Sequence, residues 1–493
     1  MAKREAAQAE ARRMLAERSS VPRSEEKQIL FGDLHVHTTY SIDAFISSLP
    51  FFAGEGAHPP ADACDFARYC SAVDFFSIND HAEGLTPEKW GRTKESIREC
   101  NARAGDAANP DMVAFVGWEW TQVGSTPETH YGHKNVILRD LAEEKLPARP
   151  ITPLPQDVLN RAPPGWALQA LQGLSLFGLG EYADFLWLVQ RLAEVPNCEP
   201  GVDTRRLPKD CRENASTAEV LYEKLGQWGF ATLVIPHGLA WGIHAPLGSR
   251  LDEQLKGAAH DPSRQRLLEI ASGHGNGEEY RPWRSFERTA DGSLACPEPT
   301  PDFLPCCWRA GEIMRERCGD LPDEECERRV EEARRLALEA GRRPHLVFPD
   351  TTAEDWLDCD QCRDCFKPAM SLRPGMTAQY SMAITSFAGG PRRFRWGFIS
   401  STDDHSGRAA TGYKQYDRRA MTDSRGPRTK YHDWVLARFV KGSPGDPQRA
   451  RPVEVGERSF RALLDSERGS SFMYPGGIVA VHSSGRDRDS IWD

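Results

Sequence analysis

Short apolar runs recur along the chain, and each is followed by polar residues able to carry chemistry. Their length and their content of β-branched and aromatic residues predict β-strands. The runs are Ile29 to Val36, Val73 to Ile78, Met112 to Trp118, Phe230 to Ile235, Leu267 to Ile270 and Phe394 to Ser400.

Helical patterns lie between these runs. Pro60-Ala61-Asp62, followed by the apolar face of Phe66, Ala67 and Cys70, predicts the start of a helix. The stretch from Ser216 to Leu225 has the same character, with Ser216 as the expected N-cap. Strands that alternate with helices indicate a parallel α/β architecture, in which functional residues gather at the carboxyl ends of the strands.

Two stretches interrupt this alternation and divide the chain. We interpret residues 141–214, with a helix-like segment from Trp166 to Leu192, and the Cys-rich residues 280–374, helical from Glu312 to Ala340, as insertions at the mouth of a barrel. The barrel itself is then expected in residues 28–140, 215–279 and 375–493. Residues 1–27 form an Arg-, Glu- and Ala-rich N-terminal arm.

Charge and hydropathy limit the classes of partner. The 493 residues carry a formal net charge of −10, which gives no electrostatic reason to bind nucleic acid or anionic membranes. No apolar run is long enough for a transmembrane helix, and the N-terminus lacks the apolar stretch of a secretory signal. The chain as written is therefore expected in the cytoplasm, or in the periplasm or outside the cell if a signal was removed. The sequence does not indicate an oligomeric state.

The cysteines allow two interpretations. Cys64, Cys70 and Cys100 are most simply buried small hydrophobic residues. Seven others lie in loop-like or charged helical stretches and can pair in an oxidising compartment: Cys198, Cys211, Cys296, Cys306, Cys307, Cys318 and Cys326. The spacing Cys359-x-x-Cys362-x-x-Cys365 invites a zinc or iron–sulfur site, but no clear fourth ligand follows, so we expect a disulfide or reduced loop cysteines there.

The first strand carries the strongest chemical signal. His35 and His37 lie on the same face of an extended strand, because side chains alternate with period two, and two imidazoles on one face can chelate a metal. Taken alone, this pattern is a weak signal and more often belongs to a surface strand with ordinary histidines. Asp43 follows six residues after His37 and can turn a carboxylate back over the strand end, although such a residue alone also fits an N-cap.

Other strand ends add further candidate ligands. Asp80 and His81 end the second strand, where the carboxylate can bind metal or act as acid or base. Glu119 lies between two tryptophans after an apolar strand, and a buried carboxylate there needs a cation or a strong partner. The remaining candidates are His133, His237, Asp403 and His405.

Together these residues predict a metal-dependent hydrolase with two or three divalent ions. Imidazoles with carboxylates suit Zn, Mn or Fe and need no thiolate. Two neighbouring metals can bind a phosphate and lower the pKa of a bridging water to about 7, which supplies a nucleophile at neutral pH.

The substrate is expected to be a small anionic molecule. Candidate contacts are Lys134, Asn135, His274, Asn276 and Arg281, and Arg408 joins Glu119 and Asp80 as a candidate catalytic residue because it follows His405 by three positions. Each cation alone also fits a solvated surface position.

At this point the sequence resembles the PHP (polymerase and histidinol phosphatase) superfamily, from about Leu30 to the end of the chain. The matching pieces are Asp33-Leu34-His35-Val36-His37-Thr38 with Ser41 and Asp43, Asn79-Asp80-His81, Glu119, His133, His237 and Ser401-Thr402-Asp403-Asp404-His405. Within the superfamily it looks most like the branch called domain of unknown function 3604 (DUF3604). Gly32-Asp33-Leu34-His35, Gly117-Trp118-Glu119-Trp120, Gly132-His133-Lys134-Asn135-Val136, Ile235-Pro236-His237-Gly238 and Ser272-Gly273-His274-Gly275-Asn276 carry that closer likeness.

The resemblance implies a distorted (β/α)₇ TIM-like barrel of PHP type with up to three metals, whose hydroxide attacks a phosphoester. His35, His37 and Asp403 would hold the first metal, and Glu119 would bridge it to a second held by His133 and His237. The third would be held by Asp43, His81 and His405. Relatives usually continue beyond the point where this chain stops at Asp493, which predicts a C-terminally truncated chain.

Three rival interpretations remain open. An amidohydrolase-like enzyme also uses His-x-His on a barrel strand, although Asp43 with Asp80-His81 favours the PHP interpretation. A non-catalytic, metal-stabilised scaffold is disfavoured by the intact ligand set. A redox protein would be centred on Cys359, Cys362 and Cys365.

Overall fold

The computed structural model describes most of the chain from residue 27 onward. The described residues are 27–50, 54, 56–124, 126–153, 180–239, 245–246, 248–273, 275–276, 283–340, 344–349, 351, 353–356, 359–360, 374–411, 429–432, 434, 445–453 and 476–493. Among them, no helix is both long and apolar enough to cross a membrane.

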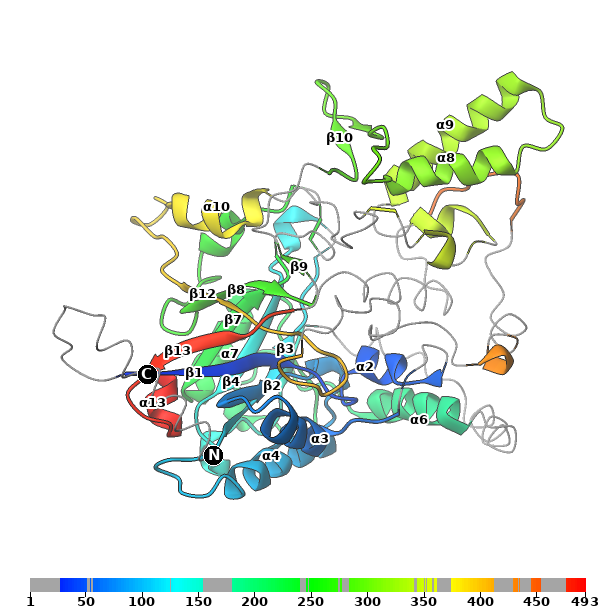
Figure 1. The fold of residues 1–493 in the computed structure, drawn as a ribbon. Helices are drawn as coiled ribbons and strands as arrows, with labels where there is room; N and C mark the ends of the chain where they lie inside the picture. Colours follow the sequence, from blue (N-terminus) through cyan, green and yellow to red (C-terminus); the bar gives the residue numbers. More distant parts are fainter. Residues whose placement is uncertain are drawn as a thin grey trace, which may run out of the picture.

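A six-stranded mixed sheet forms the centre of the molecule and curls into a half-barrel (Figure 1). Its strand order is β13 (Val479–Ser483), β1 (Gln28–Val36), β2 (Phe75–Ile78), β3 (Val113–Trp120), β4 (His133–Leu138) and β7 (Thr232–His237). Strands β1, β2, β3 and β7 coincide with apolar runs in the sequence, so these four predicted strands are confirmed, whereas β4 and β13 were not predicted.

The predicted (β/α)₇ TIM-like barrel is wrong. Strands β1, β2 and β3 are parallel, but β4 is antiparallel to both β3 and β7, and β13 is antiparallel to β1. Helices α3 (Pro60–Asp65) and α4 (Pro87–Ala102) lie between the parallel strands in the chain, whereas only the short turn η4 (Pro127–Thr129) lies between β3 and β4. Because a parallel pair needs a long crossover connection, the chain folds back after β3 instead.

A smaller sheet lies beside the half-barrel. It consists of β12 (Gly397–Ser400), β8 (Leu267–Ser272) and β9 (Gly275–Asn276), with β12 parallel and β9 antiparallel to β8. Backbone hydrogen bonds connect it to the main sheet on both sides. The Val234 N–H donates to the Arg264 carbonyl, and the Gly477 N–H donates to the Ser401 carbonyl. The Asp403 N–H donates to the His35 carbonyl and the His37 N–H donates to the Asp404 carbonyl, so the segment after β12 lies next to the end of β1.

Two hydrophobic clusters cover the faces of the main sheet. One contains Trp90, Trp118 and Trp120, all fully buried, together with residues of α3, α4 and α7 (Ala218–Trp228). The other joins strands of both sheets through side chains such as Phe115 and Ile399. The N-cap of α7 is Thr217, whose hydroxyl accepts from the Val220 N–H, so the predicted N-cap Ser216 is wrong by one residue.

The remaining elements surround these sheets. Helices α8 (Cys306–Glu316) and α9 (Asp323–Ala340) pack on each other away from the main sheet (Figure 1). The others are α2 (Ile42–Ser47), η2 (Phe66–Cys70), η3 (Ala82–Gly84), η5 (Glu143–Lys145), β5 (Ile151–Thr152), α6 (Gly180–Glu194), η8 (Thr204–Arg206), β6 (Glu213–Asn214), η9 (Leu251–Leu255), β10 (Glu287–Arg288), β11 (Leu294–Ala295), η10 (Pro344–Val347), η11 (Ala353–Trp356), η12 (Pro374–Met376), α10 (Ala378–Ala383) and α13 (Arg488–Trp492).

Five disulfides connect described residues. They are Cys64–Cys100, Cys198–Cys211, Cys296–Cys307, Cys306–Cys359 and Cys318–Cys326. The interpretation of Cys64 and Cys100 as free buried residues is wrong, because a disulfide joins α3 to α4 through them. Cys70 carries a free thiol and is exposed rather than buried. The seven cysteines expected to be able to pair are all paired.

Candidate metal centre

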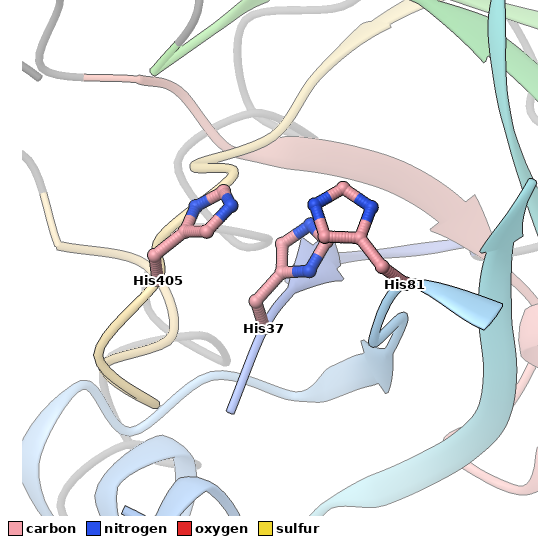
Figure 2. Close-up of side chains that lie close together, drawn as sticks. All are labelled: His37, His81 and His405. Carbon is pink, nitrogen blue, oxygen red and sulfur yellow. The ribbon is translucent and has the colours of Figure 1, made fainter. Parts of the chain in front are cut away.

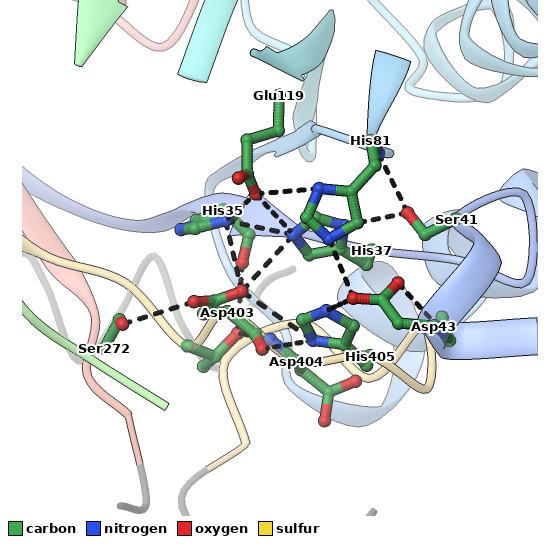
Figure 3. A network of polar contacts seen from close by, with 12 residues as sticks. His35, His37, Ser41, Asp43, His81, Glu119, Ser272, Asp403, Asp404 and His405 are labelled. Carbon is green, nitrogen blue, oxygen red and sulfur yellow. Dashed lines mark hydrogen bonds and ion pairs between the residues drawn. The ribbon is translucent and has the colours of Figure 1, made fainter. Parts of the chain in front are cut away.

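Four side chains converge at the edge of the half-barrel. His35 comes from β1, His37 directly follows that strand, Glu119 comes from β3, and Asp403 comes from the segment after β12. The Nε2 atoms of the two histidines lie 3.0 Å apart. The Oε2 atom of Glu119 is 3.3 Å from His35 Nε2 and 3.2 Å from His37 Nε2. The Oδ1 atom of Asp403 is 3.2 and 3.3 Å from the same two nitrogens (Figure 3). These four atoms form a small tetrahedron, and all are buried.

The dimensions of this tetrahedron fit a divalent metal ion. Ligand atoms bonded to zinc at about 2.0–2.1 Å lie about 3.3 Å apart in tetrahedral geometry and about 3.0 Å apart in octahedral geometry. The measured separations span this range. Imidazole nitrogens and carboxylate oxygens also form a donor set that Zn, Mn and Fe accept. The residues predicted for the first metal therefore lie where one ion would touch all of them.

Glu119 also belongs to a second group. Its other oxygen, Oε1, lies 2.8 Å from His133 Nδ1 and 3.7 Å from His237 Nε2. These two histidines lie directly opposite each other in the β4–β7 pair. One carboxylate therefore points one oxygen at each group, which is the arrangement expected of a ligand that bridges two metals.

A third group lies on the other side of His37. His37, His81 and His405 have nitrogens close enough to share an ion, and their rings face one another in Figure 2. The Oδ2 atom of Asp43 is 2.9 Å from His81 Nε2 and 3.1 Å from His405 Nε2. The three predicted residues of the third metal are thus brought together, with His37 adjacent to them.

Antiparallel strands place these ligands at one edge as effectively as parallel ones. His35 and His37 lie at or just beyond the carboxyl end of β1, and Glu119 near that of β3. His133, in contrast, is the first residue of the antiparallel strand β4. The start of an antiparallel strand lies at the same edge as the ends of its neighbours. The ligand prediction consequently did not depend on the barrel topology.

Hydrogen bonds from a neighbouring loop orient His37 and His81. The Ser41 hydroxyl lies 2.9 Å from His37 Nδ1, accepts from the His81 N–H and donates to Asp80 Oδ1 (Figure 3). The Asp80 carboxylate also accepts from the N–H and hydroxyl of Thr38. Asp80 therefore supports the loop that holds the ligands, and its predicted catalytic role stays a prediction.

A buried carboxylate on β1 fixes the position of Asp403. Asp33 accepts hydrogen bonds from the backbone and hydroxyl of Thr402 and from the Ala410 N–H. Asp403 itself has a φ of 54°, in the left-handed region that non-glycine residues rarely adopt. Such a conformation persists where surrounding contacts over-determine it, and it is common at functional sites.

Carboxylates and imidazoles of the cluster shift one another's pKa values. Burial raises the pKa of the Glu119 carboxyl, but His81, His237 and His133 outweigh this effect and hold it well below its usual range. Burial lowers the pKa of His405, but Asp43 outweighs this effect and raises it to about 10. Burial likewise raises the pKa of Asp43, but His81 and His405 outweigh this effect and hold it well below its usual range. The Glu119 and Asp43 carboxylates are therefore charged, and neighbouring imidazoles offset their charge.

His237 provides an independent test of whether a metal fits. Its ring is 2 % exposed, and neither ring nitrogen has a hydrogen-bond partner among the described residues. Burial lowers its pKa well below the usual value, and the neighbouring His35 lowers it further, so the ring is neutral. A neutral, buried imidazole without a hydrogen bond is costly. Coordination of a cation through its lone pair would remove that cost.

Two of the predicted substrate-contact residues, Asn135 and Lys134, lie on opposite faces of β4. Asn135 lies opposite Glu119 in the β3–β4 pair, fully buried, and its amide has no hydrogen-bond partner within the described part of the chain. Lys134 points to the other face, where its amine donates to the Tyr131 carbonyl and lies over the Trp120 ring. The structure does not bring Lys134 to the cluster.

The side chains of three other predicted contact residues lie outside the described part of the structure. Only the backbone of Asn276 is described, as part of β9, and His274 and Arg281 lie outside the described residues. Arg408, predicted to be catalytic, is partly exposed and its backbone N–H donates to Asp404.

Sequence reasoning missed Glu269. This β8 residue is 4 % exposed, and its carboxylate lies 3.2 Å from His35 Nδ1. The signal available in the sequence was a single carboxylate inside the apolar run from Leu267 to Ile270, because such a group needs a partner when it is buried.

The predicted cysteine-centred alternative loses one of its ligands. Cys359 forms a disulfide with Cys306 and is therefore not available as a thiolate ligand. Cys362 and Cys365 lie outside the described residues.

Comparison with known proteins gives one match. Residues 24–87 match the family model described as a protein of unknown function, DUF3604. This stretch contains β1, α2, α3 and β2, and with them His35, His37, Asp43 and His81. No curated protein and no solved structure matches the chain.

Proposed function

We propose that this protein is a metal-dependent hydrolase that holds two or three divalent ions, with phosphoesters as the favoured substrate class. The observation that carries the proposal is the position of Glu119, whose two oxygens face two separate groups of buried histidines. A carboxylate with four imidazoles around it is the donor set of a two-metal site.

Each residue has a role in this proposal. His35, His37 and Asp403 would hold the first ion, His133 and His237 the second, and Asp43, His81 and His405 the third. Glu119 would fix the spacing of the first two. Ions held in this way make water nucleophilic at neutral pH and offset the negative charge of a phosphoester.

The chain's own polar groups would orient the reactants. Asn135 lies on the same face as Glu119, and its buried amide offers both a donor and an acceptor to a substrate or water. Ser41 and Asp80 would keep His37 in the orientation that leaves Nε2 toward the cluster. The resemblance of the ligand motifs to the PHP superfamily supports phosphoesters over other substrates.

Metal content is the test of the first half of the proposal. Protein purified without chelator or nickel affinity is expected to contain two to three equivalents of Zn, Mn or Fe, and His35→Ala with His237→Ala should lose them. A protein that carries no metal and takes none up on titration would overturn the proposal.

A substrate screen tests the second half. The metal-loaded protein should hydrolyse phosphomonoesters or phosphodiesters, and added chelator should abolish the activity. Hydrolysis of amides or lactones without phosphoesters would replace the substrate class by that of an amidohydrolase-like enzyme.

A further inference from the structure

The strand β8 carries one carboxylate at a position where it contacts a candidate metal ligand. Both oxygens of Glu269 lie close to His35 Nδ1, at 3.2 and 3.3 Å. The other ring nitrogen of His35, Nε2, faces the tetrahedron formed with His37, Glu119 and Asp403. The imidazole therefore lies between the metal position on one side and Glu269 on the other.

The two histidines at the end of β1 have different partners at their Nδ1 atoms. His37 Nδ1 lies at hydrogen-bond distance from the neutral hydroxyl of Ser41, and that hydroxyl donates a hydrogen bond to Asp80. His35 Nδ1 meets a carboxylate directly, and the side chains of both His35 and Glu269 are almost completely buried. A direct carboxylate orients an imidazole more strongly than a hydroxyl does, because the hydrogen bond is charge-assisted.

We propose that Glu269 is a positioning residue for His35, an inference that rests on the proposed metal site. Glu269 accepts a hydrogen bond from the His35 Nδ1–H. The ring proton therefore stays on Nδ1, and Nε2 is unprotonated and directed at the metal. A carboxylate behind a ligand histidine fixes the tautomer and ring orientation and raises the basicity of the ligand.

The same carboxylate also adds negative charge beside the first two ions. Glu119, Asp403 and Glu269 each lie within 3.3 Å of a His35 ring nitrogen, and three carboxylates offset most of the charge of two divalent cations. Without a cation near it, a buried carboxylate in β8 would cost stability. Glu269 thus fits the metal-loaded protein better than the metal-free one.

A competing role for Glu269 is that of a direct ligand. Its carboxylate, His35 and His237 have donor atoms within 4.8 Å of one another. The two roles differ in what Glu269→Gln should do. A positioning residue keeps an acceptor for the Nδ1 proton after this change, whereas a direct ligand loses its anionic donor.

Zinc affinity and zinc stoichiometry of Glu269→Gln and Glu269→Ala separate these roles. We expect both variants to retain the wild-type number of zinc equivalents, and the affinity of one site to fall about 10–100-fold in Glu269→Ala and less in Glu269→Gln. Loss of a whole equivalent in Glu269→Gln would overturn the positioning role in favour of direct ligation. Unchanged affinity in both variants would also overturn it.

A matched control separates metal affinity from stability. Glu213 is equally buried and pairs with Arg149 and Lys224, away from the metal candidates. Glu213→Gln should lower the melting temperature and leave the zinc affinity unchanged.

Nuclear magnetic resonance of the zinc-loaded protein gives a readout that does not depend on activity. With ¹⁵N-labelled histidine, we expect a protected Nδ1–H resonance for His35 that survives in Glu269→Gln and exchanges rapidly in Glu269→Ala. An unaltered resonance in Glu269→Ala would contradict the inference. If the wild-type protein binds no zinc at all, the proposed function fails and this inference fails with it. Wild-type binding with unaffected Glu269 variants would remove only the inference.

Discussion

Two regions of the molecule bury polar and sulfur atoms for different purposes. The half-barrel with its neighbouring sheet buries histidines and carboxylates at one edge, above cores of tryptophan, phenylalanine and aliphatic side chains. The helical unit of α8, α9 and their flanking segments buries cysteines instead. Its core cluster contains five of them, and three disulfides hold it together.

The difference teaches how function and stability are divided between the regions. All groups of described residues that fit a metal ion lie in the half-barrel and the adjoining sheet. Their buried carboxylates are costly unless protonated imidazoles or a bound cation offset the charge. The helical unit contains no such group in its described part, and disulfides reduce the conformational freedom of its unfolded chain. We therefore expect metal removal to affect the first region and reduction of disulfides the second.

The largest effect is expected from Glu119→Gln. Changes to residues behind a ligand typically lower activity or metal affinity about 10–100-fold. Loss of a charge shared by the two proposed metal positions should therefore lower the proposed phosphoesterase activity by at least about 10³-fold. Steady-state kinetics and metal analysis of the same preparation would measure it. Glu331→Gln, an exposed change in α9, serves as the control and should leave both unchanged. Near-normal activity in Glu119→Gln would break the comparison, because the bridging carboxylate would then have no catalytic importance.

The second effect is expected in the helical unit. The Cys306–Cys359 disulfide closes a loop with a sequence separation of 53, whereas Cys318–Cys326 spans only 8. The chain-entropy model then gives a loss of about 4 kcal/mol for Cys306→Ser with Cys359→Ser, and about 2.5 kcal/mol for the shorter pair. Hydrogen exchange of α8 and α9 would measure local opening.

Metal content provides the contrast for this experiment. Both double variants should bind as much zinc as the wild type, because the ligands lie in the other region. Loss of metal on removing Cys306–Cys359 would mean that the two regions depend on each other.

The sequence was sufficient to predict four strands of the main sheet and the residues that the structure brings together in groups able to hold a metal. Local apolar runs determine where a strand can form, and His35, Glu119 and His237 were found because each lies at an end of such a run. The runs do not encode strand direction, which is set by the connections. The short link from β3 to β4 made the barrel prediction wrong.

One site residue could not be assigned from a local sequence pattern, and another was assigned against such a pattern. The partner of Glu269 is His35, 234 residues away in the chain, so only the folded structure reveals the pair. Lys134, in contrast, was predictable. Neighbouring side chains on a strand alternate between faces, so a ligand at His133 already directs Lys134 away from the metals.

The tightness of packing in the two regions can be compared at one glycine in each. A Cβ at Gly117 in β3 would lie 2.4 Å from the Val136 carbonyl oxygen, which is fixed by the sheet. A Cβ at Gly311 in α8 would lie 2.6 Å from the Arg334 Nε atom, which belongs to a flexible side chain. We expect Gly117→Ala to cost about 3 kcal/mol. Gly311→Ala should cost less than about 1 kcal/mol, because the arginine can move and alanine favours the helix.

Thermal and denaturant unfolding of the two alanine variants would measure this difference. Gly91→Ala is the control, since nothing lies within 4 Å of a Cβ at this position in α4. It should stabilise the protein by about 0.5–1 kcal/mol. Equal losses at Gly117 and Gly311 would show that the helical unit is packed as rigidly as the sheet.

The smallest expected effect concerns pH and the helical unit alone. Asp360 follows the disulfide-bonded Cys359, and its carboxylate accepts a hydrogen bond from the Cys306 N–H at the start of α8. Burial raises the pKa of Asp360 from 3.8 to about 6, although this backbone hydrogen bond opposes the rise. Since the pKa is raised in the folded state, its contribution to stability is complete below pH 4 and is lost as the pH rises through 6. Because the side chain is partly exposed, we expect the difference between pH 4 and pH 8 to be about 1 kcal/mol.

Asp360→Asn isolates this contribution, because asparagine keeps the acceptor and does not titrate. Asp360 has a φ of 55°, a conformation that asparagine adopts readily, so the change should not strain the backbone. At pH 8 the variant should protect the α8 amides from hydrogen exchange better than the wild type does, and at pH 4 the two should be equal. Metal binding should not differ at either pH. A variant less protected than the wild type at pH 8 would mean that the charged carboxylate stabilises the start of α8, and that burial is not the dominant influence on Asp360.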